Sequence, residues 1–221
     1  MINNNIIFID FDSTFISLES LDEFILNNIS NSANNSELRA KIERITNQGM
    51  EGIIDFNFSV NERLKYLSAN RDSIKLFSKI LKKNITNSFL SNKQFIIENS
   101  HKILIISGGF TELIAPVVRD FNIKKDQIYA NEFMFNKNGM IKTISKKTLS
   151  YKHSTKAHLV KSLNLKGLTH IIGDGMTDCE VWRKGYADEF YAFTENIMRE
   201  VVVRCSRQAI GCLDDYIKII S

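Results

Sequence analysis

Two carboxylates lie two residues apart near the start of the chain, at Asp10 and Asp12. They follow a short apolar run, and a buried charge without a partner is costly. A divalent cation would provide that partner, because hard oxygen ligands suit Mg²⁺. One such pair could also be a solvated acidic loop, but Asp174 and Asp178 repeat the arrangement after another apolar run. We therefore expect a magnesium site that draws on both regions.

The sequence also offers groups that could bind phosphate. Ser107-Gly108-Gly109 provides a hydroxyl and backbone amides that can approach an anion closely. Lys156 begins a helical pattern and could bring a positive charge to the same place. Lys152 and Lys161 are nearby alternatives for that charge. Each of these signals is weak alone, and their convergence would indicate phosphate chemistry.

Three apolar runs should position these groups. They cover residues 6–9, 103–106 and 170–172, and each ends at a polar residue or a glycine followed by an aspartate. Continuous apolar runs of this length are typical of buried parallel strands. Ligands bind at the carboxyl ends of such strands, so the three ends are expected to converge on one site.

Residues 15–89 differ from the rest of the chain. No strand pattern is convincing there, whereas Phe56, Val60, Leu64 and Leu67 recur at helical spacing, with a weak capping-box match beginning at Ser59. A second, charged helix is expected to end near residue 49. We interpret 15–89 as an all-helical cap inserted into a core formed by residues 1–14 and 90–221.

The remaining sequence alternates helical and strand patterns. A helix is expected over about 111–121, although Pro116 lies inside it. Asn138-Gly139 predicts a tight turn in a β-hairpin spanning about 133–141. Helices are expected near 155–165, 178–184 and 196–204. This order predicts an α/β fold with a parallel, Rossmann-like sheet flanked by helices.

Composition excludes several classes of protein. The 221 residues carry a net charge of +4, but the basic residues are scattered, so we expect an anionic small-molecule ligand and no nucleic acid. Neither a signal peptide nor an apolar run long enough for a membrane span is visible. The three cysteines form no CxxC pair, which favours reduced thiols in a cytoplasmic protein.

Taken together and in this order, the motifs resemble those of the haloacid dehalogenase superfamily, and in particular its phosphoserine phosphatase family. The segment 10–14 (DFDST) with Glu19, the segment 106–110 (ISGGF) and the segment 172–178 (IGDGMTD) carry the core resemblance. Met50-Glu-Gly52, Phe56, Ser59 and Arg63 are similar to the cap signature of that family. The resemblance covers nearly the whole chain.

The resemblance implies roles for the acidic residues. Asp10 would attack phosphorus and form an aspartyl-phosphate. Asp12 would protonate the leaving hydroxyl and then activate water. Mg²⁺ would lie between Asp10, the backbone carbonyl of Asp12, Asp174 and the phosphate. Asp178 would hold a metal-bound water or Lys156 in place.

The same resemblance implies the remaining site residues and the substrate. Ser107, Gly108 and Lys156 would stabilise the charge on the phosphoryl group. Glu19 would bind the ammonium group of O-phosphoserine, and Arg63 its carboxylate. Met50 and Phe56 would exclude water when the cap closes. The implied activity is magnesium-dependent hydrolysis of O-phosphoserine in serine biosynthesis.

The sequence leaves alternatives open. A phosphotransferase on the same fold would pass the phosphate to an acceptor hydroxyl, such as that of homoserine, and a related phosphatase would act on another small phosphometabolite. A non-catalytic receiver module also phosphorylates an aspartate at a strand end, but Asp12 and the inserted helices argue against it. The chain could be a monomer or a homodimer.

Overall fold

In a computed structural model of the chain, residues 5–28, 35–145 and 155–221 are described. Six strands form one parallel sheet in the order β3-β2-β1-β6-β7-β8, and β4 pairs with β5 in a separate antiparallel hairpin. The strands are β1 (Ile6–Ile9), β2 (Ile103–Phe110), β3 (Ile128–Asn131), β4 (Phe133–Phe135), β5 (Ile141–Ile144), β6 (Thr169–Gly173), β7 (Glu189–Phe193) and β8 (Gln208–Ile210). This confirms the predicted α/β class and the predicted hairpin.

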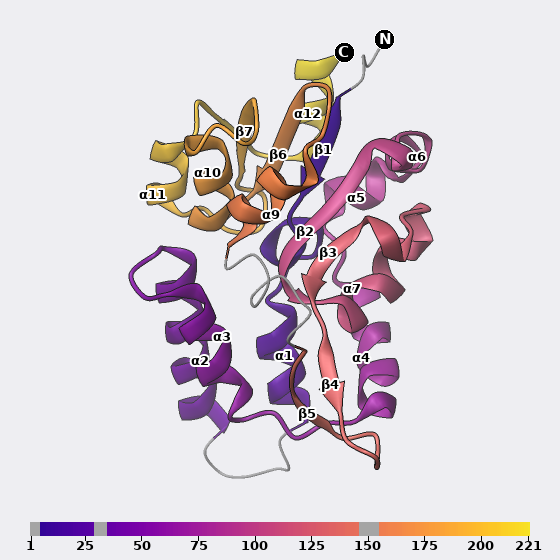
Figure 1. Cartoon of the computed structure of the whole chain (residues 1–221), viewed down its shortest axis with the longest axis vertical. Coiled ribbons are helices and arrows are strands. Elements are labelled where there is room, and N and C mark those ends of the chain that lie inside the picture. Colours follow the sequence, from indigo (N-terminus) through magenta and orange to yellow (C-terminus); the bar gives the residue numbers. More distant parts are fainter. Residues whose placement is uncertain (1–4, 29–34, 146–154) are drawn as a thin grey trace.

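Helices cover both faces of the sheet, and further helices lie beyond the carboxyl ends of its central strands (Figure 1). They are α1 (Ser20–Asn27), α2 (Asn35–Met50), α3 (Phe56–Leu64), α4 (Arg71–Lys83), α5 (Asn87–Ser91), α6 (Lys93–Glu98), α7 (Thr111–Val118), α9 (Lys156–Leu163), α10 (Met176–Arg183), α11 (Glu200–Cys205) and α12 (Leu213–Ile220). Short turns of helix are η1 (Phe11–Phe15), η2 (Ser100–Lys102), η3 (Arg119–Phe121) and η4 (Lys125–Gln127).

Alternation along β1 separates two hydrophobic layers. Ile7 and Ile9 belong to one buried cluster, whereas Phe8 belongs to the other, because successive side chains in a strand point to opposite faces. The first layer packs against α7 and α12, and the second against α9 and α10. β1 is therefore central in the sheet as well as in the core, and its carboxyl end is held in place from both faces.

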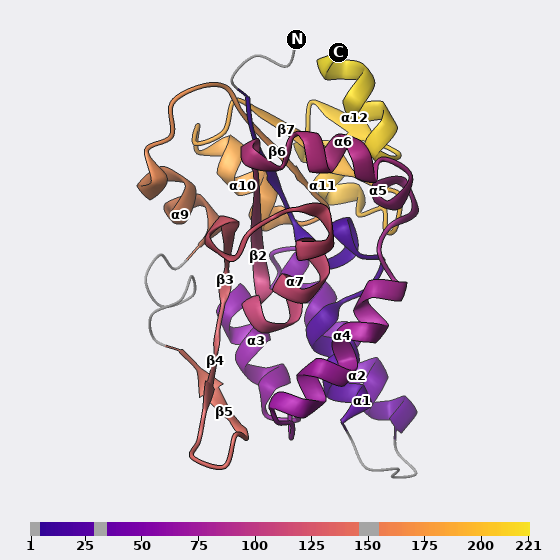
Figure 2. The ribbon, with the colours of Figure 1, turned by 90° about the vertical axis from the view of Figure 1, so that its right-hand side faces the viewer.

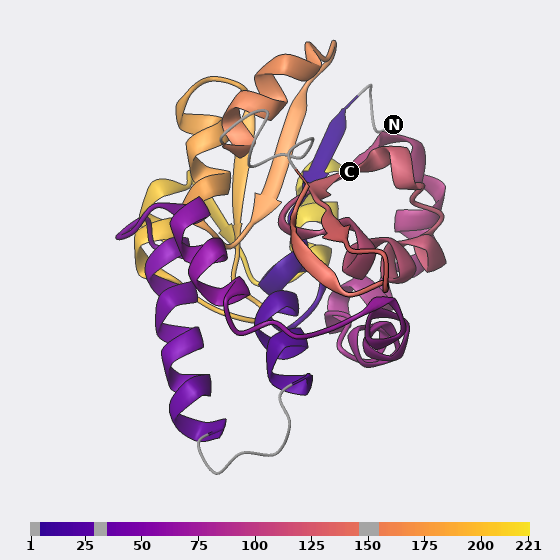
Figure 3. The ribbon, with the colours of Figure 1, turned by 60° about the horizontal axis from the view of Figure 1, so that its bottom comes forward.

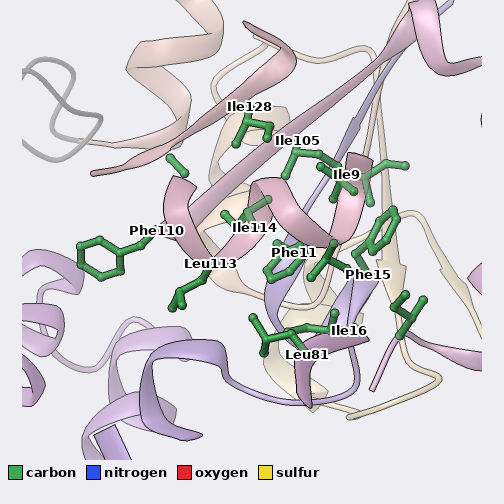
Figure 4. Close-up of a cluster of buried hydrophobic side chains, with 14 of the residues drawn as sticks. Ile9, Phe11, Phe15, Ile16, Leu81, Ile105, Phe110, Leu113, Ile114 and Ile128 are labelled. Carbon is green, nitrogen blue, oxygen red and sulfur yellow. The ribbon is translucent and has the colours of Figure 1, made fainter. Parts of the chain in front are cut away.

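The first layer continues past the end of β1 into η1. Phe11 and Phe15 are fully buried there, in the same cluster as Leu113 and Ile114 of α7 (Figure 4). Burial of aromatic side chains of this size contributes strongly to stability. The polar residues between the two phenylalanines are thus carried on a loop that is anchored at both ends.

Helices α1 to α4 and the β4–β5 hairpin lie together beyond the carboxyl ends of the central strands (Figures 1 and 2). The hairpin contacts the linker into α4, since Ile141 N donates to Ala69 O over 2.9 Å. Helix α2 packs beside α3, and both stand apart from α4 in the view from this end (Figure 3). The division into a core of residues 1–14 and 90–221 and a cap of residues 15–89 stays a prediction.

Three local expectations differ from the structure. Strand β2 continues to Phe110 and does not end at Ser107, with an irregular register after Ile106. Helix α7 ends at Val118, two residues after Pro116, and passes into η3. No capping box forms at Ser59, because the carboxylate of Asp55 caps α3 by accepting from Phe58 N.

The expectation of three reduced thiols is also wrong. A disulfide joins Cys179 of α10 to Cys205 of α11, and Cys212 is free. The two helices lie side by side, which brings the Cα atoms to 6.3 Å, within the range that a disulfide spans. This pairing joins residues 26 positions apart, so sequence spacing gave no sign of it.

Within the described part of the chain, none of the helices has both the length and the apolar character that crossing a bilayer requires.

Candidate active site

The carboxyl end of β1 places two aspartates in a buried turn. Asp10 N donates to Ile172 O of β6 over 2.9 Å, and Asp10 Oδ1 accepts from Phe11 N over 2.7 Å. The chain then reverses through Ser13, whose φ of 52° lies in the left-handed region. Asp10 and Asp12 both remain buried, at 2% and 6% exposure. The turn thus holds two carboxylates away from bulk water at the edge of the sheet.

Lys156, the first residue of α9, lies between two of these buried acids. Its Nζ is 2.9 Å from Asp10 Oδ2 and 2.8 Å from Asp178 Oδ1. Burial alone would lower the pKa of Lys156, but the two carboxylates outweigh it and raise this pKa above its ordinary value. Lys161 lies elsewhere, 5.3 Å from the ring of Tyr186, and Lys152 lies outside the described residues. Among the described lysines, Lys156 therefore lies where the sequence predicts a cation, beside Asp10.

Three carboxylates come close enough to share a cation. Oxygen atoms of Asp10, Asp174 and Asp178 all lie within 4.8 Å of one another, and all three side chains are buried. Burial raises the pKa of Asp174 to about 8 and also raises that of Asp178. An all-oxygen donor set of three buried carboxylates fits Mg²⁺.

This cluster contains the predicted ligands Asp10 and Asp174 and adds Asp178. The third predicted ligand is the backbone carbonyl of Asp12, which stays a prediction, and the Asp12 carboxylate points elsewhere, with Oδ1 accepting from Ser20 N over 2.7 Å. Burial, together with the nearby negative charge of Glu19, raises the pKa of Asp12 to about 8. A protonated carboxyl group at this position could act as an acid at neutral pH.

The end of β2 brings the predicted phosphate-binding residues Ser107 to Gly109 against Asp12. Ser107 is fully buried, and its Oγ accepts from Gly109 N over 2.9 Å. A Cβ at Gly109 would lie only 2.8 Å from Asp12 Oδ2 and 3.1 Å from Ser107 Oγ. Only glycine therefore allows the strand to pass so close to the acidic turn.

Two residues predicted to bind the substrate, Arg63 and Glu19, form polar contacts with other residues of the protein. Arg63 Nη1 lies 2.7 Å from Asp22 Oδ1, and Arg63 Nε donates to Ser59 O over 3.3 Å. Glu19 Oε1 accepts from Ser13 Oγ over 2.8 Å. Asp22, which was not among the predicted site residues, therefore orients Arg63 from the first turn of α1. The available signal was its position three residues after Glu19, the N-cap residue of α1.

Most of the predicted site residues line one small cavity. Its volume is about 10 Å³, which is room for about one water molecule. A phosphorylated amino acid can enter only if the surrounding elements move apart. The predicted residues that line it are Asp10, Asp12, Glu19, Met50, Arg63, Ser107, Gly108 and Lys156, joined by Leu21, Gly109 and Thr177.

The other predicted residues lie behind the cavity or are only partly described. Asp174 and Asp178 are buried beneath its wall, where Asp178 contacts Lys156. Phe56 is the first residue of α3, and its side chain is outside what the structure describes. Met50 ends α2 on the opposite side, and a Cβ at Gly175 would lie 3.5 Å from its Sδ. Met50 thus closes the cavity against the loop that carries Asp174.

Arg199 is a site residue that the sequence reasoning missed. Its guanidinium is buried and pairs with Asp174 Oδ2, with Glu19 Oε1 3.8 Å away. It also reaches Asn47 Oδ1 of α2, over 3.5 Å. The loop that carries it follows β7, another central strand, so identifying β7 in the sequence would have directed attention to this loop.

Comparisons of the sequence with known proteins give a family match and several relatives. The family model of haloacid dehalogenase-like hydrolases matches residues 7–183. The phosphoserine phosphatase of Homo sapiens is 26% identical over 196 residues, which are 87% of this chain and 83% of that protein. The phosphoserine phosphatase of Drosophila melanogaster is 25% identical over 91% of this chain and 72% of its own length.

Solved structures give the same picture. A phosphoserine phosphohydrolase-like protein from Francisella tularensis superposes with a TM-score of 0.86 at 31% identity, over 98% of this chain and 100% of that one. A phospho-aspartyl intermediate analogue of phosphoserine phosphatase superposes with a TM-score of 0.75 at 20% identity, over 98% of each chain. At that identity the second comparison supports the fold alone.

Proposed function

The chain belongs to the haloacid dehalogenase-like hydrolases and to their phosphoserine phosphatase family, and from this premise we propose that it hydrolyses O-phosphoserine with Mg²⁺. Membership makes the chain a phosphatase, which acts on a phosphate ester. One observation carries the proposal of its substrate. Glu19 and Arg63, an anion and a cation suited to an amino acid, line the same cavity as Asp10 and Lys156.

The proposed reaction begins at Asp10. Its carboxylate attacks phosphorus, so that a bond from Asp10 to phosphorus forms while the ester bond to the serine oxygen breaks. Asp12 gives its proton to the departing oxygen, which requires the protonated form that burial favours. In the second half, Asp12 takes a proton from water, whose oxygen displaces Asp10 and releases inorganic phosphate.

The surrounding groups stabilise charge during both halves. Lys156 pairs with Asp10 and attracts the phosphoryl oxygens. Ser107 Oγ and the amide of Gly108 provide hydrogen-bond donors at the opposite wall. Asp10, Asp174 and either Asp178 or the backbone carbonyl of Asp12 would hold Mg²⁺, which supplies orientation and charge neutralisation when bound.

Substrate selection is assigned to residues 15–89, proposed as a cap that closes over the site. Glu19 would accept the ammonium group of the substrate, and Arg63 would donate to its carboxylate. The bonds to Asp22 and Ser59 use two of the five N–H groups of Arg63, so a planar fork can still be presented. Met50 and Phe56 would exclude water from the closed site.

The decisive experiment is a phosphate-release assay on the purified chain. O-phosphoserine, other small phosphomonoesters and p-nitrophenyl phosphate would be compared with Mg²⁺, with EDTA, and with Mg²⁺ restored. We expect turnover of O-phosphoserine that EDTA abolishes and Mg²⁺ restores. A clear preference for another ester would overturn the proposed substrate. Formation of a new ester with added homoserine, in place of free phosphate, would identify a phosphotransferase.

A further inference from the structure

The side chain of Asn196 lies where the acidic turn meets the chain that returns from the helices α1 to α4. Its Nδ2 is 3.1 Å from Ser13 O, 3.3 Å from Thr14 O and 3.4 Å from Ile16 O. The same nitrogen donates to Thr86 Oγ1 over 2.7 Å. The two hydrogens of one amide group are therefore shared among three carbonyls of the outgoing segment and a hydroxyl of the returning one.

The two segments that Asn196 joins are the linkers between the sheet and the helices beyond it. They run antiparallel, with Ile16 bridged to Ile85, and Ser17 N donates to Asn84 O over 2.8 Å. Thr86 Oγ1 donates to Thr14 O over 2.7 Å, which closes a ring of contacts with Asn196. These linkers connect the helices α1 to α4 to the sheet. Any movement of these helices relative to the sheet must therefore involve the linkers.

The neighbouring residue strengthens the attachment. Glu195 accepts from Ser88 N over 3.1 Å and from the Ser88 hydroxyl. Glu195 and Asn196 both lie in the loop that follows β7, so a single loop of the core fixes the returning chain at residues 86 and 88. The outgoing chain is fixed at residues 13, 14 and 16 by Asn196 itself.

The contact to Ser13 O is the one that bears on catalysis. Ser13 has a left-handed backbone and directly follows Asp12, so its carbonyl sets the path of the acidic turn. A left-handed conformation at a residue other than glycine is strained and persists only when its surroundings hold it. The amide of Asn196 provides that restraint from outside the turn.

We propose that Asn196 is a positioning residue for the phosphatase reaction. It fixes the turn of Asp10 and Asp12 to the core, and it attaches both linkers to the core at one place. The proposal rests on the proposed function of Asp10 and Asp12. Asn196 touches neither of their carboxylates and acts through the backbone of residues 13–16. A carboxylate of the same shape could not replace it, because the oxygen atoms would face other acceptors.

The test compares Asn196→Asp with Asn99→Asp. Asn99 is also half-buried and donates through Nδ2 to one carbonyl, Phe95 O, at the end of α6, so its substitution controls for loss of an amide donor. With p-nitrophenyl phosphate as substrate, we expect Asn196→Asp to lower kcat by about 10- to 100-fold with little change in KM, because misplaced reacting groups affect the chemical step. Asn99→Asp should keep the wild-type kcat.

Hydrogen–deuterium exchange tests the same proposal without activity. Asn196→Asp should speed exchange of the amides of residues 13–17 and 84–88 while circular dichroism stays unchanged, and Asn99→Asp should not. Unchanged exchange in these residues would show that Asn196 does not fix the turn and the linkers to the core. Faster exchange with a wild-type kcat would show that this attachment does not position the reacting groups. An inactive wild type would refute the proposed function instead, and the exchange result would still show whether Asn196 fixes the two linkers.

Discussion

Lys156 Nζ lies 2.9 Å from Asp10 Oδ2, and both side chains are almost completely buried, at 4% and 2% exposure. The same Nζ contacts Asp178, so one cation is shared by two carboxylates. Burial makes each charge dependent on the others, because an unpaired charge in this environment is costly. The contact that places Lys156 against the proposed nucleophile Asp10 therefore also stabilises this part of the fold.

Replacing Lys156 by Met should cost both stability and activity. Asp10 and Asp178 would remain buried beside Asp174 without a cation, so we expect the free energy of unfolding to fall by about 3–5 kcal/mol in the presence of EDTA. Lys161→Met is the matched control, since Lys161 is exposed on the same helix. Urea unfolding followed by circular dichroism measures the difference. Equal stability of the two variants would contradict the shared-cation interpretation.

Replacing Asp10 by Asn should abolish turnover while the protein still folds. The amide is close in shape to the carboxylate but is too weak a nucleophile to form the acyl-phosphate. Phosphate release and mass spectrometry of acid-quenched enzyme provide the measurements. Only wild-type protein and the surface control Asp120→Asn should gain the mass of a phosphoryl group. Substantial residual activity in Asp10→Asn would argue against a covalent mechanism.

The central elements could be predicted from the sequence because their signals are local. The runs at 6–9 and 170–172 correspond to β1 and β6 within one or two residues, since buried parallel strands are continuously apolar. The convergence of their ends followed from a general property of such sheets. Asp10 could accordingly be predicted from its position at the end of a strand, whereas Lys156 was one of three candidate lysines and was favoured by the family resemblance.

Residues whose importance depends on distant partners could not be predicted in the same way. Arg199 pairs with Asp174, 25 residues earlier, and Arg63 pairs with Asp22, 41 residues earlier. Asn196 meets Ser13 across 183 residues. No periodicity or spacing encodes such contacts, which arise only when the order of strands in the sheet brings their loops together.

His170 should make the native state less stable in acid. Burial lowers its pKa in the folded protein, and this outweighs the opposing effect of Glu189 and Asp188. The unfolded chain therefore binds a proton more readily, so the contribution of His170 is complete above about pH 6.5 and is lost as the pH falls below that value. Its Nδ1 lies 2.9 Å from the Tyr216 hydroxyl, a contact in which the neutral ring can accept.

The variant His170→Gln isolates this effect from that of the buried acids. The difference in unfolding free energy between wild type and His170→Gln should shrink as the pH is lowered from about 7 to about 5. The exposed His101→Gln serves as the control and should follow the wild type. Urea unfolding across this range measures both. A difference that stays constant or grows in acid would show that His170 is not held neutral.

Arg63→Ala should separate substrate recognition from chemistry. If Arg63 binds the carboxylate of O-phosphoserine, its loss should raise KM for that substrate by about 10-fold or more, because a charge-assisted hydrogen bond contributes about 1.5–3 kcal/mol. p-Nitrophenyl phosphate has no carboxylate, so its KM should change much less. Arg39→Ala is the control, since Arg39 pairs with Glu23 at the exposed side of α2.

The buried pair complicates this measurement in a way that a second variant resolves. Removing Arg63 also leaves Asp22 without its partner, and the unpaired carboxylate could disturb α1 and Glu19. The double variant Asp22→Asn with Arg63→Ala removes both charges together. If KM for O-phosphoserine remains raised in the double variant while p-nitrophenyl phosphate is spared, Arg63 reads the carboxylate. Equal losses on both substrates would mean that it only supports the packing of α1 against α3.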